Sequence, residues 1–83
     1  MLICLYSHRD VALFCEILSK YTQSFDLDCG RRVVDAKSYF GVLTTAIDKV
    51  AELRVVSPIT DAELIQLKAE LNDYIPRGNI YVQ

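Results

Sequence analysis

The chain has 83 residues, of which 52% are hydrophobic and 24% are charged. This length excludes a second domain, and the composition excludes a disordered chain. The chain has nine lysines and arginines and eleven aspartates and glutamates, which gives a formal charge of −2 at pH 7. Because a surface with this balance does not neutralise many phosphates, we expect no nucleic-acid partner.

The cysteines and the N-terminal residues bear on the cellular compartment. Cys4, Cys15 and Cys29 are odd in number, lack a CxxC spacing and have apolar neighbours, so we expect reduced thiols in the core. No disulfide framework, metal site or cofactor is expected. The apolar run Met1–Tyr6 is too short for a signal peptide or a membrane span, which predicts a cytoplasmic protein without membrane contact.

The first two elements follow from the N-terminal sequence. The run Met1–Tyr6 has the length of a strand that is covered on both faces. Ser7, with Asp10 three residues later, has the form of a capping box that opens a helix. Glu16 and Lys20 form an exposed i, i+4 pair on that helix. Its apolar face consists of Val11, Phe14, Cys15, Leu18 and Tyr21.

A hairpin follows from residue 24, where the hydrophobic period changes to two. Phe25, Leu27 and Cys29 point to one side of the predicted strand 24–29. Asp26 and Asp28 lie on the other side, and we interpret them as its hydrated face rather than as a metal pair. Gly30 supplies the turn, and residues 32–35 return as an antiparallel strand.

Three more elements are predicted in the second half of the chain. Ser38 caps a short helix through Ile47, and residues 52–56 form a strand that ends before Pro58. Thr60 then opens the last helix with a second capping box. The apolar face of this helix consists of Leu64, Leu67, Leu71 and Tyr74.

The order β-α-β-β-α-β-α predicts an α+β fold, with a four-stranded antiparallel sheet and the helices on one face. We assign the domain to residues 1–76 and a C-terminal extension to residues 77–83. Ile80, Tyr81 and Val82 in this extension are apolar and β-prone. They suit an added edge strand, within this chain or across a homodimer, and a frayed tail is the alternative.

The residues from Val34 to Leu43 are Val-Asp-Ala-Lys-Ser-Tyr-Phe-Gly-Val-Leu. This segment resembles the HPr family, the histidine-containing phosphocarrier proteins of the bacterial sugar phosphotransferase system. The similarity covers residues 10–73 and includes four further segments: Leu18–Tyr21, Cys29–Arg31, Asp48–Val55 and Asp61–Leu71. The resemblance implies the family's open-faced β-sandwich, which has the element order derived above.

The resemblance also locates the phosphate-accepting histidine, which lies before the family's first helix in a motif His-x-Arg-Pro. There the arginine and the helix N–H groups hold the phosphoryl group. Arg9 matches the arginine, but Ser7 takes the position of the histidine and Asp10 that of the proline. His8 is one position out of register, which rotates a helical side chain by about 100°. If this chain is a carrier, His8 is the acceptor and Arg9 its partner; the altered motif favours a non-catalytic protein.

A second functional feature implied by the resemblance is the family's regulatory serine, which matches Ser38. Tyr39, Phe40, Val42 and Leu43 then correspond to the apolar patch that docks partner proteins in relatives. Simpler roles exist for the same residues. Serine is a common N-cap, and one of the two aromatic rings is expected to pack under the short helix.

A basic group of Arg31, Arg32 and Lys37 around the hairpin suits either an acidic partner or a solvated sheet edge. Our leading hypothesis is a non-enzymatic HPr-like module that binds a protein of the phosphotransferase system or a regulatory protein, with Ser38 as its switch. The alternatives are a phosphocarrier that uses His8 and a domain repurposed for structure or dimerisation.

Overall fold

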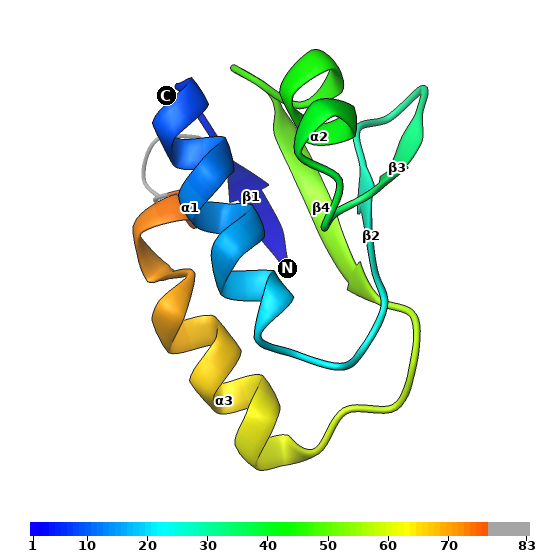
Figure 1. Cartoon of the computed structure of the whole chain (residues 1–83), viewed down its shortest axis with the longest axis vertical. Helices are drawn as coiled ribbons and strands as arrows, with labels where there is room; N and C mark the ends of the chain where they lie inside the picture. Colours follow the sequence, from blue (N-terminus) through cyan, green and yellow to red (C-terminus); the bar gives the residue numbers. More distant parts are fainter. Residues whose placement is uncertain (77–83) are drawn as a thin grey trace.

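The computed structural model describes residues 1–76, which form a four-stranded antiparallel sheet packed against three α-helices (Figure 1). The strand order is β1-β4-β2-β3, and the predicted α+β fold class is confirmed. A 3-10 turn, Asn72–Tyr74, follows the last helix. The elements are β1 Leu2–Cys4, α1 His8–Ser19, β2 Phe25–Asp28, β3 Val33–Asp35, α2 Tyr39–Thr45, β4 Val50–Val55 and α3 Asp61–Glu70.

The register of the sheet separates a covered face from an open face. β4 pairs with β1 on one side and with β2 on the other. Leu27 of β2 lies opposite Leu53 of β4, and both side chains are buried. The adjacent pair, Asp28 and Glu52, points to the other side because side chains alternate along a strand. The helices therefore cover the apolar face, and the other face carries polar side chains.

The helices and the covered face of the sheet share one core. α1 contributes Val11, Phe14 and Leu18, which are fully buried, as its apolar period predicted. α1 and α3 lie side by side (Figure 1), and Tyr21 Oη donates a 2.6 Å hydrogen bond to Glu70 Oε1 between them. The remaining buried members of the core are Ile3, Leu5, Tyr21, Phe25, Leu27, Ala36, Val42, Ala46, Ala51, Leu53, Leu67 and Leu71.

All three predicted N-caps are confirmed. Ser7 Oγ accepts the Asp10 N–H at 3.1 Å, and Ser38 Oγ accepts the Gly41 N–H at 3.3 Å. Thr60 caps α3 in a full capping box, in which Glu63 Oε1 accepts the Thr60 N–H at 3.1 Å. Each cap supplies an acceptor for an N–H that has no partner inside its helix.

The structure corrects the first strand. β1 ends at Cys4, not Tyr6, and Leu2 is 51% exposed, although a strand buried on both faces was predicted. The reason is that this sheet has helices on one face only. β4 begins at Val50, two residues before the predicted start, because Val50 pairs with Cys4 of β1.

Two other details differ from the predictions, and a third prediction is not tested. Lys20 pairs with Glu70 of α3 at 3.5 Å rather than with Glu16 of its own helix, since α1 and α3 are adjacent. The last helix ends at Glu70, so Tyr74 lies in the 3-10 turn. The predicted extension 77–83, with Ile80, Tyr81 and Val82, lies outside the described residues. Among residues 1–76, no helix has the length and apolar character to cross a membrane.

Candidate functional site

The N-terminus of α1 carries the candidate phosphoryl acceptor. His8 and Arg9 are exposed in the first turn of the helix. Ser7 occupies the N-cap position, and Asp10 Oδ2 accepts the backbone N–H of Tyr6 at 3.0 Å. The Asp10 carboxylate thus accepts the N–H of the residue before the N-cap, whereas in the predicted capping box it would accept the N–H of the N-cap itself. A negative charge already lies at the helix entrance, where it stabilises the helix dipole and repels a second anion.

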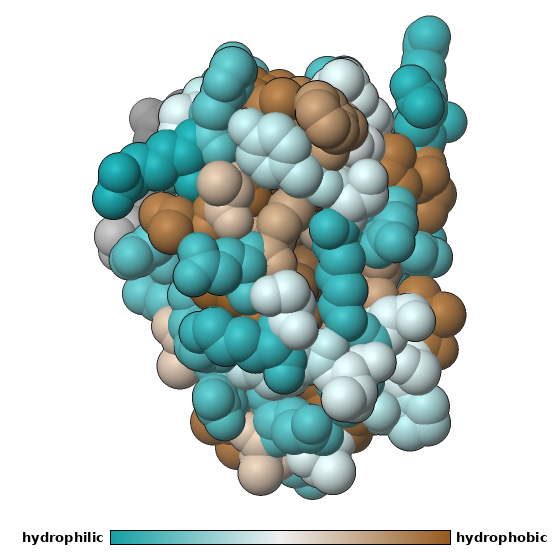
Figure 2. Space-filling model, in the orientation of Figure 1, coloured by the Kyte–Doolittle hydropathy of each residue, from teal (hydrophilic) through white to brown (hydrophobic). Residues whose placement is uncertain are grey.

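The N-terminus of α2 carries the candidate docking residues. Phe40 is 75% exposed, whereas Tyr39 is half-buried and packs against the core. Their rings are in an edge-on arrangement with centroids 5.6 Å apart. The expectation that one of the two rings packs under the helix is confirmed by Tyr39. Figure 2 shows hydrophobic residues reaching the surface in the region of α2.

The other two candidate docking residues on α2 face the core. Val42 is completely buried, so its side chain packs in the core and stabilises the helix. Leu43 is half-buried and packs against the same core. Neighbouring side chains on an α-helix point in directions about 100° apart, and the core covers one side of α2. Residues 39, 40, 42 and 43 therefore cannot all lie on one exposed patch.

Ser38 is exposed at the N-cap of α2, and its geometry depends on Gly41. A Cβ atom at Gly41 would lie 3.2 Å from Ser38 Oγ and 3.4 Å from Ser38 Cβ. The absence of a side chain at this position therefore allows the close approach of Ser38 to the first turn. Glycine, a weak helix former in the sequence, has a packing role here.

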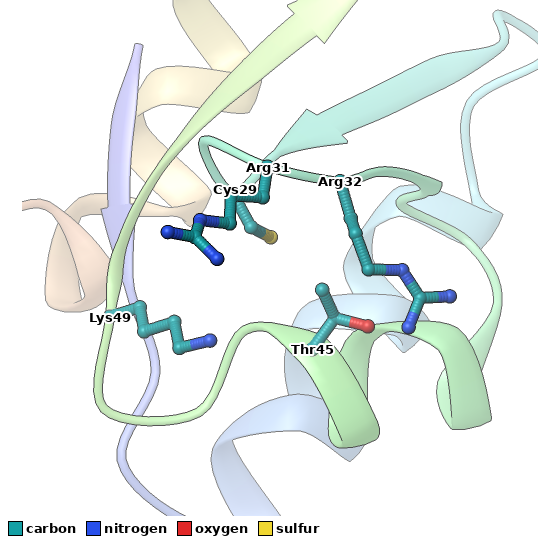
Figure 3. Close-up of a pocket in the computed structure, with 5 residues that line it drawn as sticks. All are labelled: Cys29, Arg31, Arg32, Thr45 and Lys49. Atoms are coloured by element: carbon teal, nitrogen blue, oxygen red, sulfur yellow. The ribbon is translucent and has the colours of Figure 1, made fainter.

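The basic residues are arranged differently from the prediction. Lys37 leaves the group, because its Nζ donates a 2.6 Å hydrogen bond to the Tyr21 carbonyl and lies 5.6 Å from the centroid of the Phe25 ring. Arg31 and Arg32 are joined instead by Lys49, which precedes β4. With Cys29 and Thr45 they line a pocket (Figure 3), which sequence reasoning missed because Lys49 is distant along the chain.

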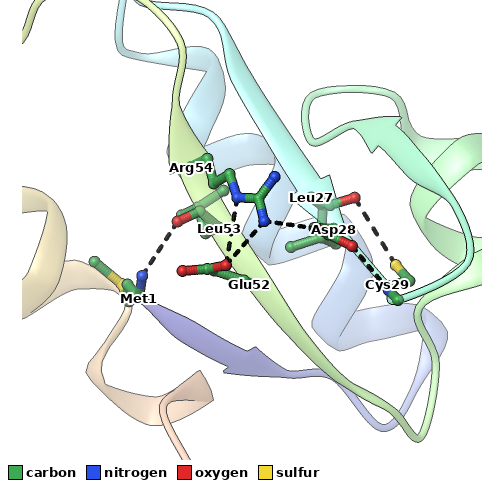
Figure 4. A network of polar contacts seen from close by, with 8 residues as sticks. Met1, Leu27, Asp28, Cys29, Glu52, Leu53 and Arg54 are labelled. Carbon is green, nitrogen blue, oxygen red and sulfur yellow. Dashed lines mark hydrogen bonds and ion pairs between the residues drawn. The ribbon is translucent and has the colours of Figure 1, made fainter.

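The paired aspartates of β2 lie on the open face of the sheet, as predicted. Asp28 Oδ2 forms a 2.7 Å ion pair with Arg54, whose guanidinium also contacts Glu52 Oε1 at 3.1 Å (Figure 4). Asp26 lies opposite Arg54 in the sheet register. Among residues 1–76, no group of three or more histidine, cysteine, aspartate or glutamate side chains has an arrangement that holds a metal ion.

The three cysteines among the described residues are free thiols. Cys4 is buried, and Cys15 and Cys29 are half-buried against the core. Burial raises the pKa of the Cys15 thiol, and the charge of Asp35 raises it further. Burial also raises the pKa of the Cys29 thiol. Since the thiolate is the reactive form, these two cysteines are poor nucleophiles at neutral pH.

No protein-family model matches the sequence, and no curated protein matches it. Two solved structures are similar to the chain along most of its length. One is HPr-C-His from Thermoanaerobacter tengcongensis, with a TM-score of 0.67, 19% identity and 88% of each chain covered. The other is a phosphocarrier protein HPr from Bacillus anthracis str. Ames, with a TM-score of 0.63, 15% identity, and 86% of this chain and 93% of that chain covered. The chain is therefore HPr-like in its fold, an open antiparallel sheet with helices on one face.

Proposed function

We propose that this HPr-like chain is a non-catalytic module that binds a protein partner through the N-terminus of α2. The observation that carries the proposal is the Phe40 ring, which is 75% exposed and contacts the ring of the better-buried Tyr39. Covering an exposed aromatic ring with a partner lowers the free energy of the complex, and aromatic side chains dominate the energetics of protein interfaces. The proposed partner is a cytoplasmic protein of the phosphotransferase system or one that regulates it.

The entrance of α1 supports a role without phosphoryl transfer. A phosphohistidine at this position needs positive charge and uncommitted N–H groups around it. Ser7 Oγ accepts one N–H of the first turn, and the Asp10 carboxylate binds the N–H of Tyr6. A phosphoryl group on His8 would therefore meet a carboxylate two residues away in the same turn.

Ser38 is the proposed switch of this surface. Its hydroxyl is exposed and directly precedes the two aromatic residues. Phosphorylation would add about two negative charges beside the N–H groups of the first turn of α2 and next to the docking rings. We expect the modified serine to keep its capping role, since a phosphate oxygen also accepts the Gly41 N–H. The partner would then meet a charged surface instead of a neutral one.

The docking proposal is tested by titrating the 15N-labelled chain with the general phosphotransferase enzyme and with the family's serine kinase, while backbone amide shifts are followed. We expect saturable shifts centred on residues 38–43 with at least one of them. Phe40→Ser should weaken binding by about tenfold or more, as expected for loss of an aromatic anchor. The matched control is Ile65→Ser on α3, because Ile65 is 70% exposed on another element. Equal weakening by both variants, or no shifts at residues 38–43, would sink the docking proposal.

The switch is tested separately with the serine kinase. An acid-stable phosphoserine that is lost in Ser38→Ala supports regulation at this position. Ser7→Ala is the control, because Ser7 is also an exposed serine at the N-cap of a helix. Failure to label Ser38 leaves this residue with its structural role as a cap only.

A further inference from the structure

A pocket lies between the β2–β3 turn, the end of α2 and the residue that precedes β4 (Figure 3). Its volume is about 370 Å³, and it is lined by Cys29, Arg31, Arg32, Thr45 and Lys49. This volume falls in the range of sites for small molecules, which is about 300–1,000 Å³. The pocket is separate from the docking surface proposed above, because it uses the C-terminal end of α2.

The lining residues concentrate positive charge in a chain whose net charge is negative. Three of the five carry a cation, and none carries a carboxylate. Within residues 1–76, Arg31, Arg32 and Lys49 form no ion pair, whereas Arg54 pairs with Asp28 on the open face. Burial and the charge of Asp28 raise the pKa of the Cys29 thiol, and the charges of Lys49 and Arg32 oppose this rise, so both cations lie near the thiol.

Thr45 adds a polar group with no partner at the same place. Thr45 is only 7% exposed, and its Oγ1 atom has no hydrogen-bond partner among residues 1–76. In Figure 3 this oxygen points toward the side of the pocket on which the Arg32 guanidinium lies. Threonine has two favourable χ1 positions in a helix, so rotation exchanges the covered hydroxyl with the methyl group. A ligand that offers an acceptor would satisfy this hydroxyl.

Two turns fix the backbone of the three cationic residues before any ligand binds. Gly30 has φ +95°, and the Cys29 N–H donates to the Arg32 carbonyl at 2.8 Å, which closes the turn that carries both arginines. Asp48 has φ +62°, and the Lys49 N–H donates to the Ala46 carbonyl at 3.2 Å. Backbone that is already ordered lowers the conformational entropy lost on binding.

We propose that this pocket binds the phosphate group of a small phosphate monoester. Guanidinium groups match phosphate oxygens with two parallel hydrogen bonds, and a lysine ammonium adds a third positive charge. The Thr45 hydroxyl donates to a remaining oxygen. The carbon part of the ester lies against the apolar part of the lining, which the Cys29 side chain supplies. The ester therefore binds more tightly than inorganic phosphate.

The experiment titrates the 15N-labelled full chain with inorganic phosphate, glycerol 3-phosphate or glycerol, with ionic strength held constant by sodium chloride. We expect saturable amide shifts at residues 29–32 and 45–49 with both phosphates, tighter binding of the ester, and no shifts with glycerol. Tighter binding of inorganic phosphate would overturn the assignment to an ester. The absence of saturation for both phosphates would overturn the site itself.

Variants then assign the binding to the named side chains. Arg32→Gln and Lys49→Gln should each weaken the ester by about tenfold, as loss of a charged hydrogen bond to phosphate predicts. Thr45→Val keeps the shape of the residue, so it should fold normally and weaken the ester by about threefold or more. Lys68→Gln removes a positive charge from the last turn of α3 and should leave the affinity unchanged. An equal loss in Lys68→Gln would show a nonspecific effect of net charge and would overturn the proposal.

Discussion

Asp28 and Arg54 lie in neighbouring strands and form a 2.7 Å ion pair on the open face of the sheet (Figure 4). The same carboxylate accepts the Gly30 N–H through Oδ1 at 2.8 Å. One side chain thereby joins β2, β4 and the turn between β2 and β3. Since Arg31 and Arg32 follow Gly30 directly, the polar face of the sheet helps to hold the two arginines of the pocket.

Lys37 has a structural role that the exposed Lys20 lacks. Its Nζ donates to the Tyr21 carbonyl at 2.6 Å, just beyond the end of α1. We expect Lys37→Met to lower the free energy of unfolding by about 1–2 kcal/mol, because a charge-assisted hydrogen bond to a carbonyl is lost. Urea unfolding followed by circular dichroism measures the difference.

Lys20→Met is the matched control for Lys37→Met. The Lys20 side chain is 59% exposed and contacts Glu70 at 3.5 Å. Exposed ion pairs of this kind contribute little, so the change should stay below about 0.5 kcal/mol. A larger loss in Lys20→Met than in Lys37→Met would contradict the role assigned to Lys37.

Thr45 and Thr44 are adjacent threonines with opposite hydrogen bonding. Thr45 Oγ1 is buried without a partner, whereas Thr44 Oγ1 donates to the Phe40 carbonyl at 2.8 Å on an exposed surface. Thr45→Val should raise the free energy of unfolding by about 1 kcal/mol, because the unsatisfied hydroxyl is removed at constant shape. Thr44→Val should change it by less than about 0.5 kcal/mol. Thermal unfolding of both variants tests this contrast, and a less stable Thr45→Val would refute it.

Signals within a few residues were enough to predict the elements. Ser7, Ser38 and Thr60 each cap a helix as expected, because a cap requires one side chain and an N–H three residues later. Together with the period of the apolar residues, these caps predicted the fold class.

The candidate sites depend on contacts that the local pattern does not contain. The sequence pattern groups Lys37 with the arginines of the hairpin, yet its ammonium binds the carbonyl of Tyr21, 16 residues away in the chain. Lys49 enters the pocket because Asp48 adopts a positive φ and turns the chain into β4. Aspartate is among the few residues enriched in that conformation, which was the one available signal.

Tyr21 makes stability depend on pH at the alkaline end. Burial and the hydrogen bond to Glu70 raise the pKa of Tyr21 from 10.0 to about 12. The folded pKa exceeds the unfolded pKa, so the contribution of this phenol is complete below pH 10 and is lost as the pH rises through about 12. The melting temperature should therefore fall more steeply above pH 10 in the parent chain than in Tyr21→Phe. Parallel curves for the two proteins in this window would contradict the assignment.

The proposal that His8 is not a phosphoryl acceptor rests on the entrance of α1, where the Asp10 carboxylate accepts the N–H of Tyr6. The direct measurement is incubation of the chain with phosphoenolpyruvate and the general phosphotransferase enzyme, with the phosphocarrier protein HPr from Bacillus anthracis as the positive control. We predict that the control acquires acid-labile phosphate while this chain does not. An acid-labile phosphohistidine on this chain that disappears in His8→Ala would contradict the account.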